Sequence, residues 1–153
     1  FTFFGIIPNF PPSLILQQVR SLMGNDDYLL ASANLAPHGM EHILPQYDNL
    51  PTRRWLEQFL IDHEITGGSL QIDIRRQNNL EWFQADYVFE ADTSTSIGGR
   101  RIEFKSGAAL QLFVSHRYTP ESASAIFAEH GLHIEHTFLS ENREEGVFMC
   151  RPQ

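Results

Sequence analysis

The chain opens on a nearly unbroken apolar run, Phe1-Thr2-Phe3-Phe4-Gly5-Ile6-Ile7. A run of this kind is typical of a strand that is buried on both faces in the middle of a parallel sheet. Because an interior strand is an unusual place for a natural chain to begin, we expect the sequence to be part of a longer protein. The turn-forming residues at 8–12 end the predicted strand.

A helix and a second strand follow this run. Ser13 is a suitable N-cap for a helix over residues 14–23, where apolar residues recur at helical spacing. Residues 28–33 are again apolar and predict a second buried strand. A strand, a helix and a strand in this order predict a right-handed crossover unit of a parallel sheet.

The pattern changes after residue 37. Residues 38–51 are rich in Pro, Asn and Gly and predict a loop, and Thr52 is a suitable cap for a helix over 53–63. Four alternating segments then predict an antiparallel meander. They span residues 69–76, 80–90, 100–106 and 108–117.

A helix over residues 119–129 and a hairpin that pairs 133–139 with 146–151 end the sequence. The sequence therefore predicts an α/β fold, with sheet units at both ends of the chain and an antiparallel insertion between them. In doubly wound sheets, ligands bind at the carboxyl ends of the strands, so three segments are predicted to share one functional edge. They are residues 5–9, residues 34–37 and the loop around Tyr47.

The composition narrows the classes of function. Of the 153 residues only 11 are Lys or Arg, and the net charge is −8. This balance argues against a nucleic-acid or anionic-membrane surface, because phosphate binding needs clustered cations. No apolar run approaches the roughly 20 residues of a membrane span. The single cysteine, Cys150, excludes an internal disulfide and suggests a reducing, cytoplasmic location.

Four short motifs occur in a particular order along the chain. They are Phe3-Phe4-Gly5-Ile6-Ile7-Pro8-Asn9-Phe10, Leu30-Ala31-Ser32-Ala33-Asn34-Leu35, Gln46-Tyr47-Asp48-Asn49 and Val114-Ser115-His116-Arg117-Tyr118. Their order and spacing resemble the C-terminal half of the histidine-specific, S-adenosylmethionine-dependent methyltransferases. This family includes the histidine Nα-methyltransferase of ergothioneine biosynthesis.

The resemblance implies a class I, Rossmann-like methyltransferase sheet with an inserted α+β antiparallel substrate domain. Residues 1–37 would form the second half of the methyltransferase core. Residues 38–118 would form the inserted substrate-binding subdomain, and residues 119–153 would return to the core as a helix and a terminal hairpin. The partner of this chain would be the missing N-terminal half of the same fold.

The resemblance also assigns roles to individual residues. Asn9 matches a family Asn that holds the substrate amine, and Tyr47 matches a Tyr that helps to bind the substrate amino group. Phe4 and Gly5 would lie near the methyl donor through backbone contacts. Without the resemblance, turn statistics favour Asn9 as an ordinary turn residue, and Tyr47 is equally a half-buried loop aromatic.

One position departs from the family pattern. The histidine enzymes have a Glu two residues before the Ser that matches Ser115, and both grip the imidazole, but this chain has Phe113 at the Glu position. Phe113 and Ser115 would then shape the far end of the substrate pocket. Without the carboxylate, an imidazole N–H would be buried unpaired, so we expect an amine or amino-acid substrate other than histidine.

The cofactor would be S-adenosylmethionine, but most of its binding site would precede Phe1. The Gly-rich turn and the acidic residue that grips the ribose belong to the first two strands of the family fold. Gly98-Gly99 does not replace that turn, because it falls in a predicted hairpin. We therefore expect the isolated chain to be inactive and to bind S-adenosylmethionine weakly.

Two other functions compete with methyl transfer. The chain could be a non-catalytic binding module that lacks the cofactor half. A zinc hydrolase is the third possibility, because residues 38–42 fit the H-x-x-E-H pattern with His38 and His42 as ligands. Pro37, Gly39 and Pro45 would limit that helix to about one turn, so no metal site is expected there.

Overall fold

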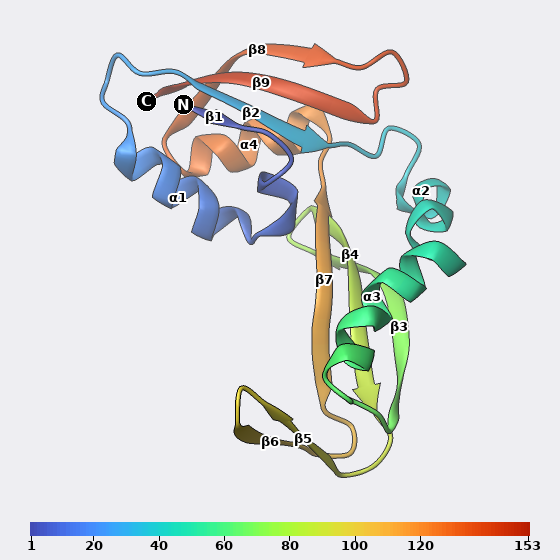
Figure 1. Cartoon of the computed structure of the whole chain (residues 1–153). Helices are drawn as coiled ribbons and strands as arrows, with labels where there is room; N and C mark the ends of the chain where they lie inside the picture. The colour runs from blue at the N-terminus through green and yellow to red at the C-terminus, as the bar shows by residue number, and fades with distance from the viewer.

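The computed structural model describes residues 1–153, apart from the side chain of Phe3. Its strands form three sheets, which are a four-stranded sheet in the order β1-β2-β9-β8, a three-stranded sheet in the order β3-β4-β7, and the two-stranded hairpin β5-β6. Figure 1 shows that the four-stranded sheet combines the two ends of the chain, whereas the other two sheets come from its middle.

The four-stranded sheet and its helices form the first layer. Its elements are β1 (Thr2–Phe3), η1 (Ile7–Asn9), α1 (Pro12–Leu22), β2 (Leu29–Asn34), α4 (Pro120–Glu129), β8 (Leu132–Leu139) and β9 (Glu145–Pro152). The parallel pairing of β1 with β2 and the antiparallel pairing of β8 with β9 confirm two sequence predictions. Helix α1 begins at Pro12 after Pro11, so the predicted Ser13 cap is wrong.

One apolar core joins this sheet to α1 and α4, which lie on the same face of it (Figure 1). Residues of β2 alternate between buried and half-buried, as expected for a strand with one covered face. Leu16 of α1 and Phe127 of α4 are fully buried in this core, and so is Phe148 of β9. The sheet thus has a sealed core on the face that α1 and α4 cover.

The opening run is not the interior strand that its sequence predicts. Strand β1 covers two residues and stands at the edge of the sheet, where Phe1 and Phe4 are 48% and 54% exposed. Within the described residues β1 pairs on its β2 side alone. Gly5, with φ of +70°, then turns the chain into η1, because positive φ is incompatible with a continuing strand.

The three-stranded sheet, two helices and the hairpin make up the second layer. Its elements are α2 (Met40–Tyr47), α3 (Leu50–Asp62), β3 (Gly68–Gln77), β4 (Leu80–Phe89), β5 (Thr93–Ile97), β6 (Arg100–Phe104) and β7 (Ala109–Arg117). The predicted single meander is wrong, because β7 pairs directly with β4. Hydrogen bonds from Phe89 N to Ala108 O and from Gly107 N to Phe89 O join the end of β4 to the residues that precede β7. The hairpin β5-β6 therefore projects as a separate arm.

Residues 38–51, predicted as a loop, contain α2 despite Pro45 inside the helix. Met40 and Ile43 of α2 are buried against Phe83 of β4, and this packing outweighs the breaker residues. Asn49, rather than Thr52, is the N-cap of α3. No helix among the residues that the structure describes is long and apolar enough to cross a membrane.

The two layers are joined where β7 leaves the three-stranded sheet. Tyr118, directly after β7, donates its N–H to Asn34 O at 3.1 Å and accepts from Ala36 N at 3.2 Å. This short parallel bridge fixes the end of β7 beside the end of β2. The free edge of β7 consequently faces the turn that follows β1 (Figure 1).

Candidate functional site

Asn9 ends the 3₁₀ turn η1, and its side chain is held by the backbone of the same turn. Asn9 Nδ2 donates to Gly5 O at 3.1 Å, while Gly5 N donates to Ser32 Oγ of β2 at 2.7 Å. Asn9 is exposed, and its Oδ1 is left as an acceptor without a hydrogen bond among the described residues. The turn thus presents an oriented acceptor at the carboxyl end of β1.

His116 of β7 anchors this turn to the second layer. Its Nδ1 lies 2.9 Å from Pro8 O, and because a carbonyl only accepts, Nδ1 carries the proton. Burial lowers the pKa of His116, and the bond to Pro8 opposes that shift. The ring also packs against Trp82 with 5.6 Å between centroids. A neutral, buried imidazole therefore fixes the residue next to Asn9.

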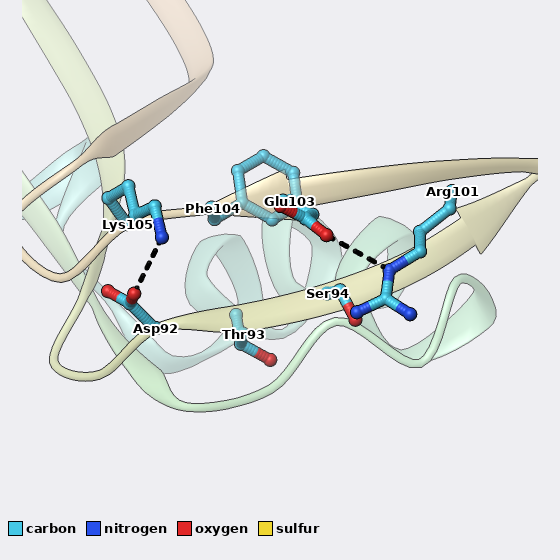
Figure 2. Close-up of a pocket in the computed structure, with 7 residues that line it drawn as sticks. All are labelled: Asp92, Thr93, Ser94, Arg101, Glu103, Phe104 and Lys105. Atoms are coloured by element: carbon cyan, nitrogen blue, oxygen red, sulfur yellow. Dashed lines mark hydrogen bonds and ion pairs between the residues drawn. The ribbon is translucent and has the colours of Figure 1, made fainter.

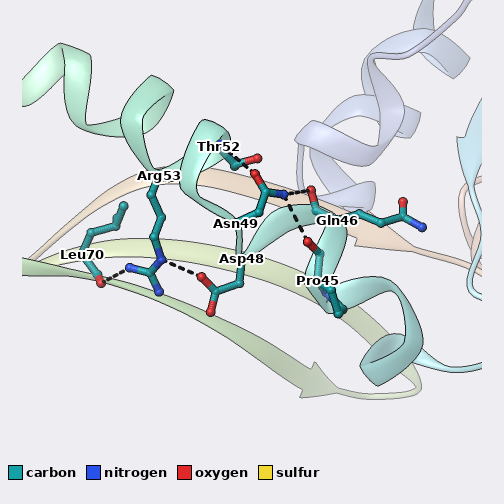
Figure 3. A network of polar contacts seen from close by, with 7 residues as sticks. All are labelled: Pro45, Gln46, Asp48, Asn49, Thr52, Arg53 and Leu70. Carbon is teal, nitrogen blue, oxygen red and sulfur yellow. Dashed lines mark hydrogen bonds and ion pairs between the residues drawn. The ribbon is translucent and has the colours of Figure 1, made fainter.

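A network of hydrogen bonds holds the short link between α2, which ends at Tyr47, and α3 (Figure 3). Asn49 Oδ1 accepts from Thr52 N at 3.0 Å, while Asn49 Nδ2 donates to Pro45 O and Gln46 O at 3.1 and 2.7 Å. These bonds use both ends of one amide to join the last turn of α2 to the first turn of α3.

Asp48 completes the network of this loop. Its carboxylate accepts from Arg53 Nε at 2.6 Å, and Arg53 Nη1 donates to Leu70 O of β3 at 3.0 Å (Figure 3). The ion pair raises the pKa of Arg53. The Asp and Asn of the Gln-Tyr-Asp-Asn motif are thus explained by structure, because they hold in place the two residues that directly follow Tyr47.

Tyr47 lies over the three-stranded sheet in a cluster of aromatic rings. Its ring stacks on Phe83 with centroids 4.5 Å apart and on Phe113 of β7 with centroids 5.7 Å apart. Arg117 Nη2 donates to the Tyr47 hydroxyl, and the guanidinium carbon lies 5.1 Å from the Tyr47 ring centroid. Because the Tyr47 oxygen accepts from a cation, its own O–H is available to donate elsewhere.

Arg117 was missed by the sequence reasoning, although a signal was present. Residues 113, 115 and 117 share one face of β7 because side chains alternate along a strand, so Arg117 follows the two predicted site residues on their side. It is 8% exposed, and burial lowers its pKa, while Tyr47 acts in the opposite direction. Its Nε is buried without a partner among the described residues.

Asn9 and Phe113 line the same hollow at the free edge of β7. Trp55 of α3 closes its opposite side and meets the Phe113 ring edge to face, with 6.2 Å between centroids. Tyr47 reaches this group through its stacking on Phe113. Ser115, the fourth predicted residue, is 1% exposed and lies opposite Phe83 in the ladder. Two predicted residues, Asn9 and Phe113, therefore line one hollow, while Tyr47 stacks on Phe113 behind it and Ser115 lies within the sheet.

The turn after β1 contains the two residues with predicted cofactor contacts. A Cβ built on Gly5 would meet nothing within 4 Å, so a ligand could approach this backbone closely, and the neighbouring Phe4 ring is exposed. No turn with more than one glycine joins a strand to a helix among the described residues, and Gly98 and Gly99 join β5 to β6. The backbone of this turn is thus open to solvent at Gly5, and the predicted cofactor contacts of Phe4 and Gly5 stay a prediction.

The predicted zinc motif and the single cysteine show less of the geometry that a functional site needs. The rings of His38 and His42 lie 5.6 Å apart, but Arg76 holds the intervening Glu41 carboxylate in an ion pair. Within the described part of the chain, no group of three or more His, Cys, Asp or Glu side chains could hold a metal ion. The thiol of Cys150 is buried in the first core, and burial raises its pKa to about 12, which disfavours a nucleophilic thiolate.

A polar hollow also lies on the β5-β6 arm (Figure 2). Its charged side chains pair with each other, since Lys105 contacts Asp92 at 2.8 Å and Arg101 contacts Glu103 at 3.2 Å. These pairs are exposed and face solvent, so they contribute little to stability. The arm lies at the far end of the second layer from η1, and its hollow is separate from the one that contains Asn9.

Comparison with known proteins gave the following similarities. No curated protein matches the chain. Among solved structures, an S-adenosylmethionine-dependent methyltransferase from Clostridium acetobutylicum aligns at 9% identity and TM-score 0.44, over 99% of this chain and 56% of its own. The glycopeptide N-methyltransferase MtfA aligns at 8% identity and TM-score 0.41, over 99% of this chain and 57% of its own.

A third structure is the amino pentose methyltransferase CalS10 from Micromonospora echinaspora. It aligns at 10% identity and TM-score 0.36, over 90% of this chain and 49% of its own. The chain thus spans about half the length of these three proteins. The model of one family, described as histidine-specific methyltransferase, SAM-dependent, matches residues 5–152. The chain therefore belongs to the histidine-specific, S-adenosylmethionine-dependent methyltransferases.

Proposed function

We propose that the full-length protein containing this chain transfers a methyl group from S-adenosylmethionine to the nitrogen of an amino acid or a related small amine. The observation that supports this best is the meeting of Asn9 and Phe113 in one hollow, with Tyr47 stacked on Phe113. These residues come from η1, β7 and the end of α2, and the family resemblance assigns a substrate contact to each position.

The chain contributes orientation to the reaction. Asn9 Oδ1 accepts one N–H of the amine and so fixes the direction of the nitrogen lone pair. Arg117 holds the Tyr47 hydroxyl so that its O–H points toward the substrate. The buried positive charge of Arg117 disfavours a second cation nearby and therefore favours the neutral, nucleophilic amine. Bound S-adenosylmethionine supplies an electrophilic sulfonium methyl group.

The proposal also assigns a separate role to each region of the chain. Residues 1–37 and 119–153 belong to the methyltransferase core, and residues 38–118 form the substrate-binding subdomain. The chain acts as the C-terminal half of the enzyme in the cytoplasm, with Phe4 and Gly5 against the cofactor. Because the described residues offer only one edge of a cofactor site, the isolated chain is inactive.

Methyl transfer by the full-length protein tests the proposal. The protein is incubated with S-adenosylmethionine and a panel of amino acids and amines, and the demethylated cofactor is measured. Methylation of at least one amine supports the proposal, and product mass spectrometry must locate the methyl group on nitrogen. Cofactor binding without transfer to any amine would contradict it and would favour a non-catalytic binding module.

Calorimetry tests the dependence of cofactor binding on the rest of the fold. The full-length protein should bind S-adenosylmethionine at micromolar concentration, whereas the isolated chain should give no measurable heat. Circular dichroism of the isolated chain is the control, since an unfolded chain would also fail to bind. Micromolar binding by a folded isolated chain would contradict this part of the proposal.

A further inference from the structure

A groove between α3 and β7 extends the hollow that contains Asn9. The structure has two adjoining hollows here, of about 320 and 520 Å³, and both are lined by Trp55, Gln111 and Leu112. Because they share these walls, they form one continuous groove that begins at Asn9 and runs along α3. Its size falls in the range of small-molecule sites, which is roughly 300–1,000 Å³.

The walls of the groove are large apolar side chains left open to solvent. Trp55 is 65% exposed and Phe59 is 45% exposed, and their spacing of four residues puts both on one face of α3. Leu110 and Leu112 of β7, which are half-buried, line the opposite wall. A contiguous exposed apolar surface of this kind marks a binding site more often than a solvated face.

Aromatic rings surround the end of the groove nearest Asn9. Trp55 meets Phe113 edge to face, and Tyr47 stacks on the same Phe113 ring. Stacked and edge-to-face contacts suit a further aromatic or alkyl group, which keeps its contacts without losing hydrogen bonds to water. Charge is sparse, because the carboxylate among the described lining residues, Asp62, already accepts from Gln58 Nε2 at 2.7 Å.

Asp62 is also too remote to replace the family Glu. It lies seven residues beyond Trp55 on α3, which corresponds to roughly 10 Å along the helix axis. An imidazole next to Phe113 would therefore leave an N–H buried without an acceptor, which disfavours its binding. A phenyl or branched alkyl group has no N–H and carries no such cost beside Phe113.

We propose that this groove holds an aromatic or bulky apolar side group of the methyl-accepting amine, while Asn9 holds its nitrogen. The inference rests on the proposed function and adds a substrate class to it. Continuity with Asn9 argues for the substrate as the occupant, because a group bound at Phe113 must share the hollow with the amine. A second copy of the chain or another protein on this face is an alternative that the experiment tests.

Turnover by the full-length protein gives the first measurement. With S-adenosylmethionine saturating, phenylalanine and leucine should show kcat/KM at least about tenfold above that of histidine or glycine. Trp55→Ala should lower the ratio of phenylalanine to glycine kcat/KM about tenfold, mainly through KM. Ile61→Ala is the matched control, because Ile61 is 66% exposed on the same helix and does not line the groove.

Phe113→Glu provides the reciprocal variant. It restores the carboxylate of the family pattern, so it should reverse the preference and make histidine better than phenylalanine. A wild-type preference for histidine, or an unchanged phenylalanine to glycine ratio in Trp55→Ala, would overturn the inference while leaving methyl transfer intact. Loss of methylation on mixing with an excess of an inactive Asn9→Ala copy would instead indicate that a second copy covers the groove.

Calorimetry separates this inference from the proposed function. Phenylalanine binding to the wild-type protein should be lost in Trp55→Ala and kept in Ile61→Ala. Binding that depends on Trp55 but leads to no methylation supports the groove and contradicts methyl transfer. If phenylalanine neither binds nor is methylated, the inference is overturned whatever other amines do.

Discussion

The two layers of the molecule bury their apolar side chains to different degrees. In the first layer, the residues from α1, α4 and the four-stranded sheet form a core in which most members are completely inaccessible. In the second layer, α3 buries Leu56 and Leu60 against the sheet but leaves Trp55 and Phe59 outside. The first layer thus has a sealed core, although Leu14 and Leu22 of α1 stay exposed outside it, while the second layer keeps the Trp55 and Phe59 rings open on one face of α3.

This difference in burial indicates which layer supports the site and which layer can contact a ligand. Side chains that are sealed in a core can support a site but cannot touch a ligand, whereas the open rings on α3 can. The junction between the layers is polar, since His116 binds the Pro8 carbonyl and Tyr118 bridges to Asn34. The predictions below vary residues of the first-layer core, the junction and the open face of α3 in turn.

The largest expected effect is a loss of stability on substitution in the core of the first layer. Phe127→Ala removes a completely buried ring that contacts Phe148 at 5.9 Å between centroids, and it should cost about 3–5 kcal/mol of unfolding free energy. Phe59→Ala on the open face should cost much less, because its ring is already 45% exposed. Denaturant unfolding of the full-length variants measures both. Equal losses would contradict the contrast between the layers.

The next largest effect is a loss of catalytic activity on substitution of Asn9, at the junction of the two layers. Asn9→Ala removes the oriented acceptor, and kcat/KM for the best amine should fall about a hundredfold. The fold should be little affected, because Asn9 is exposed and bonds only within its own turn. Asn142→Ala, at the exposed tip of the β8-β9 hairpin, is the matched control and should retain activity. Equal activity of the two variants would rule out a substrate contact at Asn9.

Much of the first layer could be predicted from the sequence, because its strands and α1 have clear apolar patterns and clear turn residues. The edge position of β1 could not be predicted in the same way. An apolar run shows that both faces avoid water, but it does not show what covers them, and Phe1, Phe4 and Ile6 are exposed in this chain. The interior position remained an extrapolation from that pattern.

The second layer was harder to predict because tertiary contacts override local signals there. Pro45 and Gly39 are breaker residues, yet Met40 and Ile43 find a buried position against Phe83 and α2 forms. For the site, motif matching singled out Asn9, Tyr47 and Phe113, which the fold brings together. It assigned no role to Arg117, although Arg117 lies inside one of the four motifs, and it missed Trp55, because their contacts with Tyr47 and Phe113 form only when α2 and α3 pack on the sheet.

A pH dependence follows from His116 at the junction. Because burial lowers its pKa in the folded state, the unfolded chain takes up the proton first, and folding loses stability as the medium becomes acidic. The His116 contribution is fully present above the unfolded value near 6.5 and is lost as the pH falls through the lower folded value. His116→Gln keeps an N–H donor for Pro8 but does not titrate.

Unfolding free energies measured between pH 8 and pH 5 check this sign. The wild-type protein should lose more stability over this range than His116→Gln, by roughly 1 kcal/mol for each unit by which the pKa is lowered. At pH 8 the two should differ by only about 1 kcal/mol, the net value of one hydrogen bond. A steeper acid loss in His116→Gln than in the wild-type protein would show that His116 is not buried in its neutral form.

The smallest expected effect is the loss of stability in Trp55→Ala. It is a sharp test of the exposed face of α3, because the next residue along the helix is buried. Leu56 is 5% exposed and Trp55 is 65% exposed. Leu56→Ala should cost about 2–5 kcal/mol of unfolding free energy, whereas Trp55→Ala should cost no more than about 1 kcal/mol, the value of its contact with Phe113. A large loss from Trp55→Ala would mean that the Trp55 ring contributes to the core of its own layer. Its exposure would then reflect incomplete packing, and a stable Trp55→Ala variant with altered substrate preference could not be obtained.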